Sequence, residues 1–175
     1  MLGGIRSGKS RWAEAAIAES LQADQPVQYL ATGQVVDTGD AAWRQRTAEH
    51  RDRRPSHWST VETDDVARQL RQARDTPTLV DDIGGWLTAT LDKRQAWDGR
   101  SLSPDVDDLT AAVAEFNSPL VLVSPEVGLT VVAATVSARR FSDELGALNQ
   151  RLAAVCERVV LVVAGHPLPI KQAEA

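Results

Sequence analysis

Short apolar runs and longer periodic segments alternate along the chain. The short runs are continuous in apolar and β-branched residues, a pattern typical of strands buried on both faces of a sheet. These runs predict four strands, at Val27–Ala31, Thr78–Val80, Leu120–Val123 and Val159–Ala164. We therefore expect a sheet that is covered on both sides.

Between these runs, apolar residues recur every three or four positions, which is the spacing of an amphipathic helix. The spacing predicts helices over 13–21, 66–70, 109–116 and 145–155. Ser103, Pro104 and Asp105 predict a helix start with Ser103 as the N-cap, whereas Asp92–Ser103 is polar and aperiodic and predicts a mobile loop. Alternating strands and helices favour βαβ units, and therefore a mainly parallel sheet with right-handed crossovers.

Composition narrows the class of protein. With 175 residues and 18.9 kDa, the chain is expected to form one domain over residues 1–175. No apolar run approaches the roughly 20 residues that cross a bilayer, and no secretory signal opens the chain, so we expect a cytoplasmic protein without a membrane span. A formal net charge of -5 argues against a nucleic-acid-binding protein, which normally presents a broad basic face.

The segment 3–10 reads GGIRSGKS and fits the pattern G-x-x-x-x-G-K-[ST] of a phosphate-binding loop. In such a loop, backbone N–H groups turn toward phosphate oxygens, the lysine adds positive charge, and the final hydroxyl binds Mg²⁺. We therefore predict that Lys9 contacts the outer phosphates and that Ser10 is a metal ligand. The predicted nucleotide-binding residues of the loop are Gly3, Gly4, Ile5, Arg6, Ser7, Gly8, Lys9 and Ser10.

The strand before this loop is unusually short. A phosphate-binding loop normally follows a buried strand of about five residues, yet only Met1 and Leu2 precede Gly3. We expect the first strand to be truncated and the natural start to lie upstream, because a missing central strand would leave the backbone groups of its neighbours unpaired.

A nucleotide site that uses Mg²⁺ also needs a carboxylate at the end of another strand. The run Thr78–Val80 is followed directly by Asp81 and Asp82. Asp81 comes first after the apolar run and is the predicted metal ligand. Asp82 is expected to lie beside it without binding the metal directly. Acids at strand ends are common, so this prediction depends on the loop.

Five arginines lie between positions 44 and 54, around His50. Arg46 and His50 are four residues apart, which places them on one face of a helix. Neighbouring cations disfavour protonation, so the imidazole would stay neutral and nucleophilic, while the guanidinium groups could neutralise a triphosphate. From spacing alone, a solvated helix face with a chance histidine is the other interpretation.

The order of these motifs resembles that of the bifunctional adenosylcobinamide kinase/adenosylcobinamide-phosphate guanylyltransferase family of cobalamin assembly. The resemblance covers nearly the whole chain and rests on GGIRSGKSRWAE, YLATG, AEHRDRRPSHW, LVDD with WLT, VLVSPEVG, LNQRLAAVCERVVLVVAG and PIK. It implies an α/β fold of the P-loop NTPase (RecA-like) type, with a mainly parallel sheet and helices on both faces.

The resemblance implies two reactions and two catalytic residues. A nucleoside triphosphate phosphorylates the aminopropanol hydroxyl of adenosylcobinamide, and GMP from GTP then passes through a histidine to adenosylcobinamide phosphate, giving adenosylcobinamide-GDP. The family's guanylylated histidine precedes a basic stretch that ends in Arg-Pro and Trp, which matches His50 and not His57. Lys9 would stabilise charge on the leaving pyrophosphate.

The same resemblance implies further site residues, substrates and partners. It adds Arg46 and Glu62 to Asp81 as nucleotide-binding residues and places Glu126 near the nucleotide or the acceptor; Glu62 and Glu126 are equally well read as carboxylates that cap local backbone. GTP and ATP are the expected substrates, Mg²⁺ the cofactor and adenosylcobinamide the acceptor. Relatives suggest a homo-oligomer, a trimer.

Some positions depart from the family pattern. Asp82, Gly84 and Ala89 stand where the family tends to have Cys, Thr and Asn, and Pro125 and Ala133 stand where it tends to have Asn and Pro. These departures bear on the acceptor site more than on nucleotide binding.

Two other functions stay open: a P-loop small-molecule kinase without a covalent intermediate, and a nucleotide-binding regulatory or inactive subunit. Trp58 and Trp86 are candidate contacts for a corrinoid ring, although core packing is the favoured interpretation of both.

Overall fold

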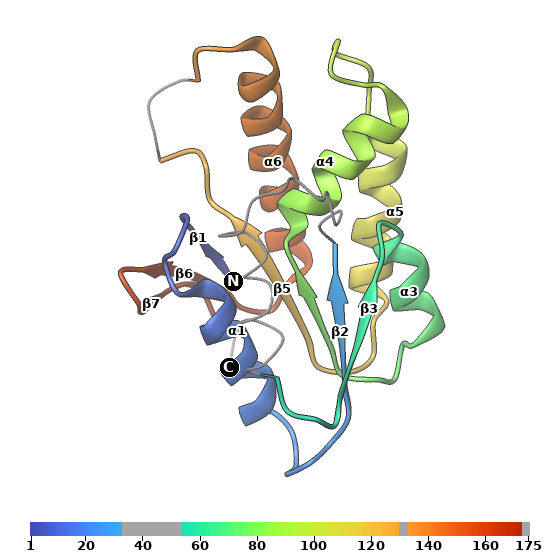
Figure 1. Ribbon diagram of the computed structural model, residues 1–175, viewed down its shortest axis with the longest axis vertical. Coiled ribbons are helices and arrows are strands. Elements are labelled where there is room, and N and C mark those ends of the chain that lie inside the picture. The colour runs from blue at the N-terminus through green and yellow to red at the C-terminus, as the bar shows by residue number, and fades with distance from the viewer. Residues whose placement is uncertain (33–53, 130–132, 173–175) are drawn as a thin grey trace.

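The computed structural model describes residues 1–32, 54–129 and 133–172. In these ranges seven strands form one sheet, in the order β3-β2-β4-β5-β1-β6-β7 (Figure 1). All described pairings are parallel except that of β6 with β7. The strands are β1 Leu2–Gly3, β2 Val27–Ala31, β3 Trp58–Glu62, β4 Thr78–Asp81, β5 Leu120–Pro125, β6 Val159–Val163 and β7 His166–Lys171. The predicted mainly parallel sheet is confirmed.

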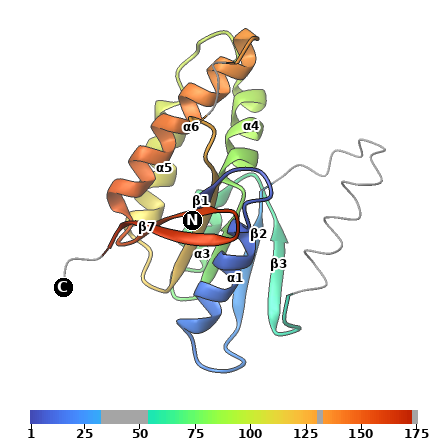
Figure 2. The same ribbon diagram turned by 90° about the vertical axis from the view of Figure 1, so that its left-hand side faces the viewer.

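Helices cover both faces of the sheet, as predicted. They are α1 Lys9–Glu19, α3 Val66–Gln72, α4 Ile83–Arg94, α5 Ser103–Ala114 and α6 Val136–Val155. Figure 2, which looks toward the β7 edge, shows α5 and α6 on one side of the sheet and α1 on the other.

Alternation along the strands explains the two layers. On one face, Tyr29 and Leu79 pack against Ile17 of α1. On the other face, Leu30 and Val80 pack with the larger apolar cluster of α3, α4, α5 and α6. Because consecutive strand residues point to opposite faces, a continuous apolar run serves both layers.

The four predicted strands are present; β2 has the predicted bounds, and β4, β5 and β6 differ at their ends by one or two residues. The end of β6 is one residue earlier than predicted, because Ala164 and Gly165 form a tight turn into β7. Both turn residues have positive φ, 50 and 81 degrees, as a two-residue hairpin turn requires. The helix start near Ser103 is also present, but Leu102 holds the cap position and Ser103 lies inside α5, so the predicted cap is wrong.

The segment Asp92–Ser103 is not the mobile loop that its polarity predicts. Its first three residues belong to α4. Ala96 and Leu102 are fully or almost fully buried in the larger core, and the Arg94 guanidinium lies 2.8 Å from Asp105 of α5. A few buried apolar residues hold this mostly polar segment to the fold.

The short strand β1 lies in the middle of the sheet, between β5 and β6. Leu2 is in register with Ser124 on one side and Leu161 on the other. The Met1 amino group donates to the Leu122 carbonyl at 2.7 Å, and burial lowers its pKa. The pairing of β1 with both neighbours places the phosphate-binding loop at the carboxyl edge of the sheet, between β5 and β6.

In the described ranges, none of the helices combines the length and the apolar character needed to cross a membrane.

Candidate active site

The phosphate-binding loop, residues 3–10, joins β1 to the first turn of α1. Gly8 precedes α1 with φ 95 degrees, a conformation that favours glycine. Gly3 is required for space, because a Cβ atom there would lie 2.5 Å from Ser7 Oγ and 2.7 Å from the Val162 carbonyl oxygen. Backbone conformation and close packing therefore explain both glycines of the motif pattern.

The turn between β6 and β7 supports this loop from outside. Gly165 N–H donates to the Ser7 carbonyl at 2.9 Å, and the indole N–H of Trp12 donates to the Gly165 carbonyl at 2.7 Å. A Cβ on Gly8 would lie 3.4 Å from Gly165 Cα. Sequence reasoning missed this support, because nothing in the spacing links Trp12 to a residue 153 positions later.

The lysine and hydroxyl of the loop are the first two residues of α1. Lys9 Nζ lies 3.5 Å from the Gly4 carbonyl oxygen, so its charge is held over the loop. Ser10 Oγ donates to Asp81 Oδ1 at 3.4 Å, although the two residues are 71 positions apart. Asp81 ends β4, and β5 lies between that strand and β1. The structure therefore brings together the hydroxyl and the carboxylate that the sequence assigned to one metal.

A buried tyrosine holds the other oxygen of Asp81. Tyr29 donates its phenol O–H to Asp81 Oδ2, and its side chain is fully buried. Burial raises the pKa of the phenol above its ordinary value, and the negative charge and hydrogen bond of Asp81 raise it further. The phenol therefore stays protonated and fixes the orientation of the carboxylate.

Arg54 connects the basic segment to this tyrosine. Its guanidinium carbon lies 3.4 Å from the centroid of the Tyr29 ring, within the range of a cation–π contact. Arg54 Nη1 also donates to Thr60 Oγ1 of β3 at 2.9 Å. His50 and Arg46, the other residues predicted for this segment, lie outside the described residues.

Asp82 has a different environment from Asp81. It precedes α4 with φ 83 degrees, and Thr32 Oγ1 donates to its carbonyl and to that of Asp81. Although Asp82 lies at the surface, surrounding protein limits the solvation of its carboxyl group and raises its pKa. Asp81, which faces Ser10 directly, is the better placed of the two for a cation.

Oxygen ligands at this point suit Mg²⁺, which prefers carboxylate, hydroxyl and phosphate oxygens. Ser10 and Asp81 supply a hydroxyl and a carboxylate within 3.4 Å of each other. The described residues contain no group of three or more His, Cys, Asp or Glu side chains that would hold a metal by themselves. The donor set fits a cation shared with a bound nucleotide.

The two glutamates have different surroundings. Glu62 ends β3 in register with Ala31, and Ala31 is in register with Asp81, so two strand spacings, about 10 Å, separate Glu62 from Asp81. Glu126 Oε1 accepts from Gly128 N–H at 2.7 Å. Glu126 therefore caps local backbone, which is one of its two predicted roles.

Asn149 is a buried structural residue, although it stands beside polar residues in the sequence. It is 7% exposed, accepts from Ser124 Oγ at 2.6 Å and donates to the Pro125 carbonyl at 3.1 Å. These bonds tie α6 to the end of β5. Two departures from the family pattern also meet here, because a Cβ on Gly84 would lie 2.7 Å from Pro125 Cγ.

Comparisons with known proteins agree with this geometry. The family model described as cobinamide kinase / cobinamide phosphate guanyltransferase matches residues 1–170. The chain is 43% identical over 176 residues to the bifunctional adenosylcobalamin biosynthesis protein CobP of Pseudomonas aeruginosa, with 98% of this chain and 95% of that protein covered. It is 38% identical over 182 residues to the bifunctional adenosylcobalamin biosynthesis proteins CobU of Salmonella typhimurium and Escherichia coli, with 97% of each chain covered.

A match of this length and identity identifies the family and its P-loop fold. The motif order in the sequence predicted the same assignment. The chain belongs to the cobinamide kinase / cobinamide phosphate guanyltransferase family, and it is a bifunctional transferase of cobalamin biosynthesis.

Proposed function

We propose that both reactions use a nucleoside triphosphate bound at the phosphate-binding loop, and that the second reaction passes through a covalent histidine. The observation that carries the proposal is the meeting of Ser10 Oγ and Asp81 Oδ1 at 3.4 Å, beside Lys9 and the loop. This arrangement combines a loop suited to phosphate, the positive charge of Lys9 and a pair of oxygen ligands at one edge of the sheet.

In the kinase step, the aminopropanol hydroxyl oxygen of adenosylcobinamide bonds to the γ-phosphorus. The bond from that phosphorus to the β–γ bridging oxygen breaks, the nucleoside diphosphate leaves, and the hydroxyl proton is released. Lys9 neutralises charge on the transferring and leaving phosphates. We propose ATP or GTP as the donor and adenosylcobinamide phosphate as the product.

In the nucleotidyl step, a ring nitrogen of His50 attacks the α-phosphorus of GTP and pyrophosphate leaves. A phosphate oxygen of adenosylcobinamide phosphate then attacks the same phosphorus, the nitrogen–phosphorus bond breaks, and adenosylcobinamide-GDP forms. A covalent carrier divides one difficult displacement into two easier ones. Arg46 and Glu62 are proposed to bind the nucleotide, and Glu126 to lie near the nucleotide or the acceptor.

Ser10 and Asp81 would hold Mg²⁺, which when bound would supply positive charge to the phosphates. Tyr29 keeps the Asp81 carboxylate oriented through its O–H donor. We also propose a homo-oligomer, a trimer by resemblance, which sedimentation of the purified chain would test.

Incubation with GTP labelled on its α-phosphate tests the covalent step. We expect protein-bound GMP that is labile in acid, and its loss in a His50→Ala variant. His57→Ala is the matched control, because His57 contacts only Asp24, at 3.8 Å, among its described ion pairs; this variant should keep the label.

Label retained by His50→Ala would exclude His50 as the carrier. A small-molecule kinase without a covalent intermediate predicts no label in either variant or in the wild type, together with full kinase activity. An inactive regulatory subunit predicts GTP binding without release of pyrophosphate.

A further inference from the structure

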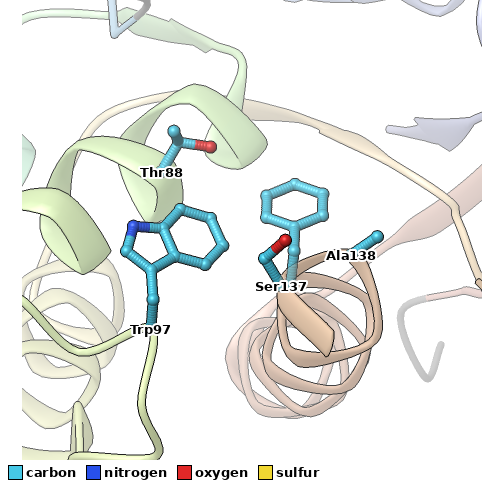
Figure 3. A pocket seen from close by; sticks show the side chains of 5 residues that line it. Thr88, Trp97, Ser137 and Ala138 are labelled. Atoms are coloured by element: carbon cyan, nitrogen blue, oxygen red, sulfur yellow. The ribbon is translucent and has the colours of Figure 1, made fainter. Parts of the chain in front are cut away.

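Five side chains from distant parts of the chain enclose an open cavity of about 570 Å³ between α4 and α6. Thr88 belongs to α4, Trp97 to the connection between α4 and α5, and the others to the first turns of α6. Figure 3 shows Trp97 and Thr88 on one side of the space and Ser137 and Ala138 on the other. We call this cavity the aromatic cleft; its residues are Thr88, Trp97, Ser137, Ala138 and Phe141.

We propose that the aromatic cleft binds the corrinoid body of the acceptor, with its edge between Trp97 and Phe141. The inference rests on cobinamide being the acceptor, which the family assignment provides, and it does not require the covalent step at His50. None of the five described side chains that line the cleft is charged. A neutral, aromatic lining suits a macrocycle bearing amide and methyl groups, and it does not suit a triphosphate.

The walls of the cleft are fixed before any ligand binds. The Trp97 indole N–H donates to Asp92 Oδ1 at 2.7 Å, which sets the plane of the ring. Arg140 of α6 donates to the Arg100 carbonyl at 2.7 Å, so the connection that carries Trp97 is tied to the helix that carries Phe141. Because little side-chain freedom is lost on binding, a preformed cleft binds a rigid ligand at a lower entropic cost.

The cleft is placed at a distance that the acceptor can span. α4 begins directly after Asp81 and Asp82, and Thr88 lies six residues beyond Asp82, about 9 Å along the helix. We place the corrinoid between α4 and α6, with its aminopropanol arm directed along α4 toward Asp81 and Asp82. The open side of the cavity leaves room for the rest of the macrocycle, which is larger than the cavity itself.

Hydroxyl groups provide the polar contacts that such a ligand needs. Thr88 Oγ1 donates to the Gly84 carbonyl at 3.0 Å, so its lone pairs can accept from a substrate amide. Ser137 is exposed on the opposite wall and lies 3.5 Å from Thr135 Oγ1. Two hydroxyls facing an aromatic space match the amide-bearing rim of a corrinoid.

A second cavity, on another side of α4, differs from the aromatic cleft in size and in the charge of its lining. It encloses about 230 Å³, and six charged side chains are among its lining residues. Some of these charges pair within the protein, as Lys93 does with Asp64 at 3.8 Å and Arg94 with Asp105 at 2.8 Å. This small space, lined by charged side chains, suits a large macrocycle bearing amide and methyl groups poorly, so the aromatic cleft is the better candidate.

Filling the cleft tests the proposal. Ser137→Trp introduces a large ring at an exposed position, and Ala147→Trp, at an exposed position of the same helix outside the cleft, is the matched control. We expect Ser137→Trp to raise the KM for cobinamide in the kinase assay by about tenfold or more, with the KM for the nucleotide within about twofold of wild type. Ala147→Trp should change neither constant.

Removing a wall gives a second measurement. Trp97→Ala should weaken cobinamide binding in equilibrium dialysis, and Trp97→Phe, which keeps an aromatic wall, should restore most of it. A melting curve for each variant shows that it is folded. Labelling of the protein with GMP from GTP needs no acceptor. If the wild type were not labelled, the covalent step would be contradicted and this proposal would stay intact.

The proposal is overturned by an unchanged cobinamide KM in folded Ser137→Trp, or by an equal rise in the KM for the nucleotide. A change in sedimentation behaviour with an unchanged cobinamide KM would also overturn it, because the cleft would then be a contact between copies of this chain.

Discussion

The phosphate-binding loop and the aromatic cleft are built in opposite ways. The loop is one continuous segment, residues 3–10, which joins β1 to α1 and carries Lys9 and Ser10 side by side. The cleft combines five residues, which lie between positions 88 and 141 and belong to α4, α6 and the connection after α4. A contiguous backbone motif carries its geometry in its own spacing, whereas a cleft exists only once separate elements have packed. This difference explains why the nucleotide site can be predicted from the amino-acid sequence and the acceptor site cannot.

The largest effect should come from Lys9→Ala, which impairs the phosphate-binding loop and leaves the aromatic cleft unchanged. Loss of the only loop lysine removes charge stabilisation from the phosphates, and we expect both activities to fall by about 10²- to 10³-fold. Cobinamide binding in equilibrium dialysis should stay within about twofold of wild type. Alanine is a good helix former at the first residue of α1, so the fold is preserved.

Lys93→Ala is the matched control, since Lys93 is exposed near the end of α4. A parallel loss of cobinamide binding in Lys9→Ala would show that the two sites are not independent.

A smaller effect is expected from Tyr29→Phe, which removes only the O–H that donates to Asp81. Without that donor the carboxylate is less well oriented, and we expect the Mg²⁺ concentration for half-maximal kinase activity to rise roughly tenfold. The Phe ring keeps the packing against Ile17 and Leu79 and the surface that Arg54 contacts. Activity at saturating Mg²⁺ should recover most of the wild-type value. An unchanged Mg²⁺ response would mean that Tyr29 is only a core residue.

The smallest effect should come from Trp12→Phe, which removes the indole donor to the Gly165 carbonyl. A neutral hydrogen bond contributes about 1 kcal/mol, so we expect nucleotide affinity to fall about fivefold, measured by titration calorimetry. Cobinamide binding should be unaffected, because the turn at Gly165 contacts the loop and not the cleft. Equal nucleotide affinity in the variant and the wild type would show that the loop holds its shape without the turn.

The fold was predictable where local pattern and burial agree. β2 has the predicted bounds, and β4, β5 and β6 differ by one or two residues. α4 was missed because Gly84 and Gly85 disfavour a helix, yet packing against α6 and the sheet stabilises it. β7 was missed because it contains Pro167 and Pro169, which are tolerated on an edge strand.

Site residues show the same division. Ser10 and Asp81 were predicted as partners and lie together, while Tyr29, Trp12 and Gly165 gave no signal in the spacing. Trp86 was a candidate for a corrinoid contact, but it is 4% exposed in the core. Burial distinguishes it from Trp97, and burial follows from tertiary packing.

The sequence by itself determined the phosphate-binding loop, the acid at the end of β4, the parallel sheet and the family. The first three depend on residues that are neighbours in the chain or on a period of two or of three to four residues, and the family follows from the order of short motifs along the chain. Only the tertiary structure decided that Tyr29 orients Asp81, which turn supports the loop and which tryptophan faces an open cleft. These contacts join residues tens of positions apart, and packing of the layers, rather than local conformational preference, selects them.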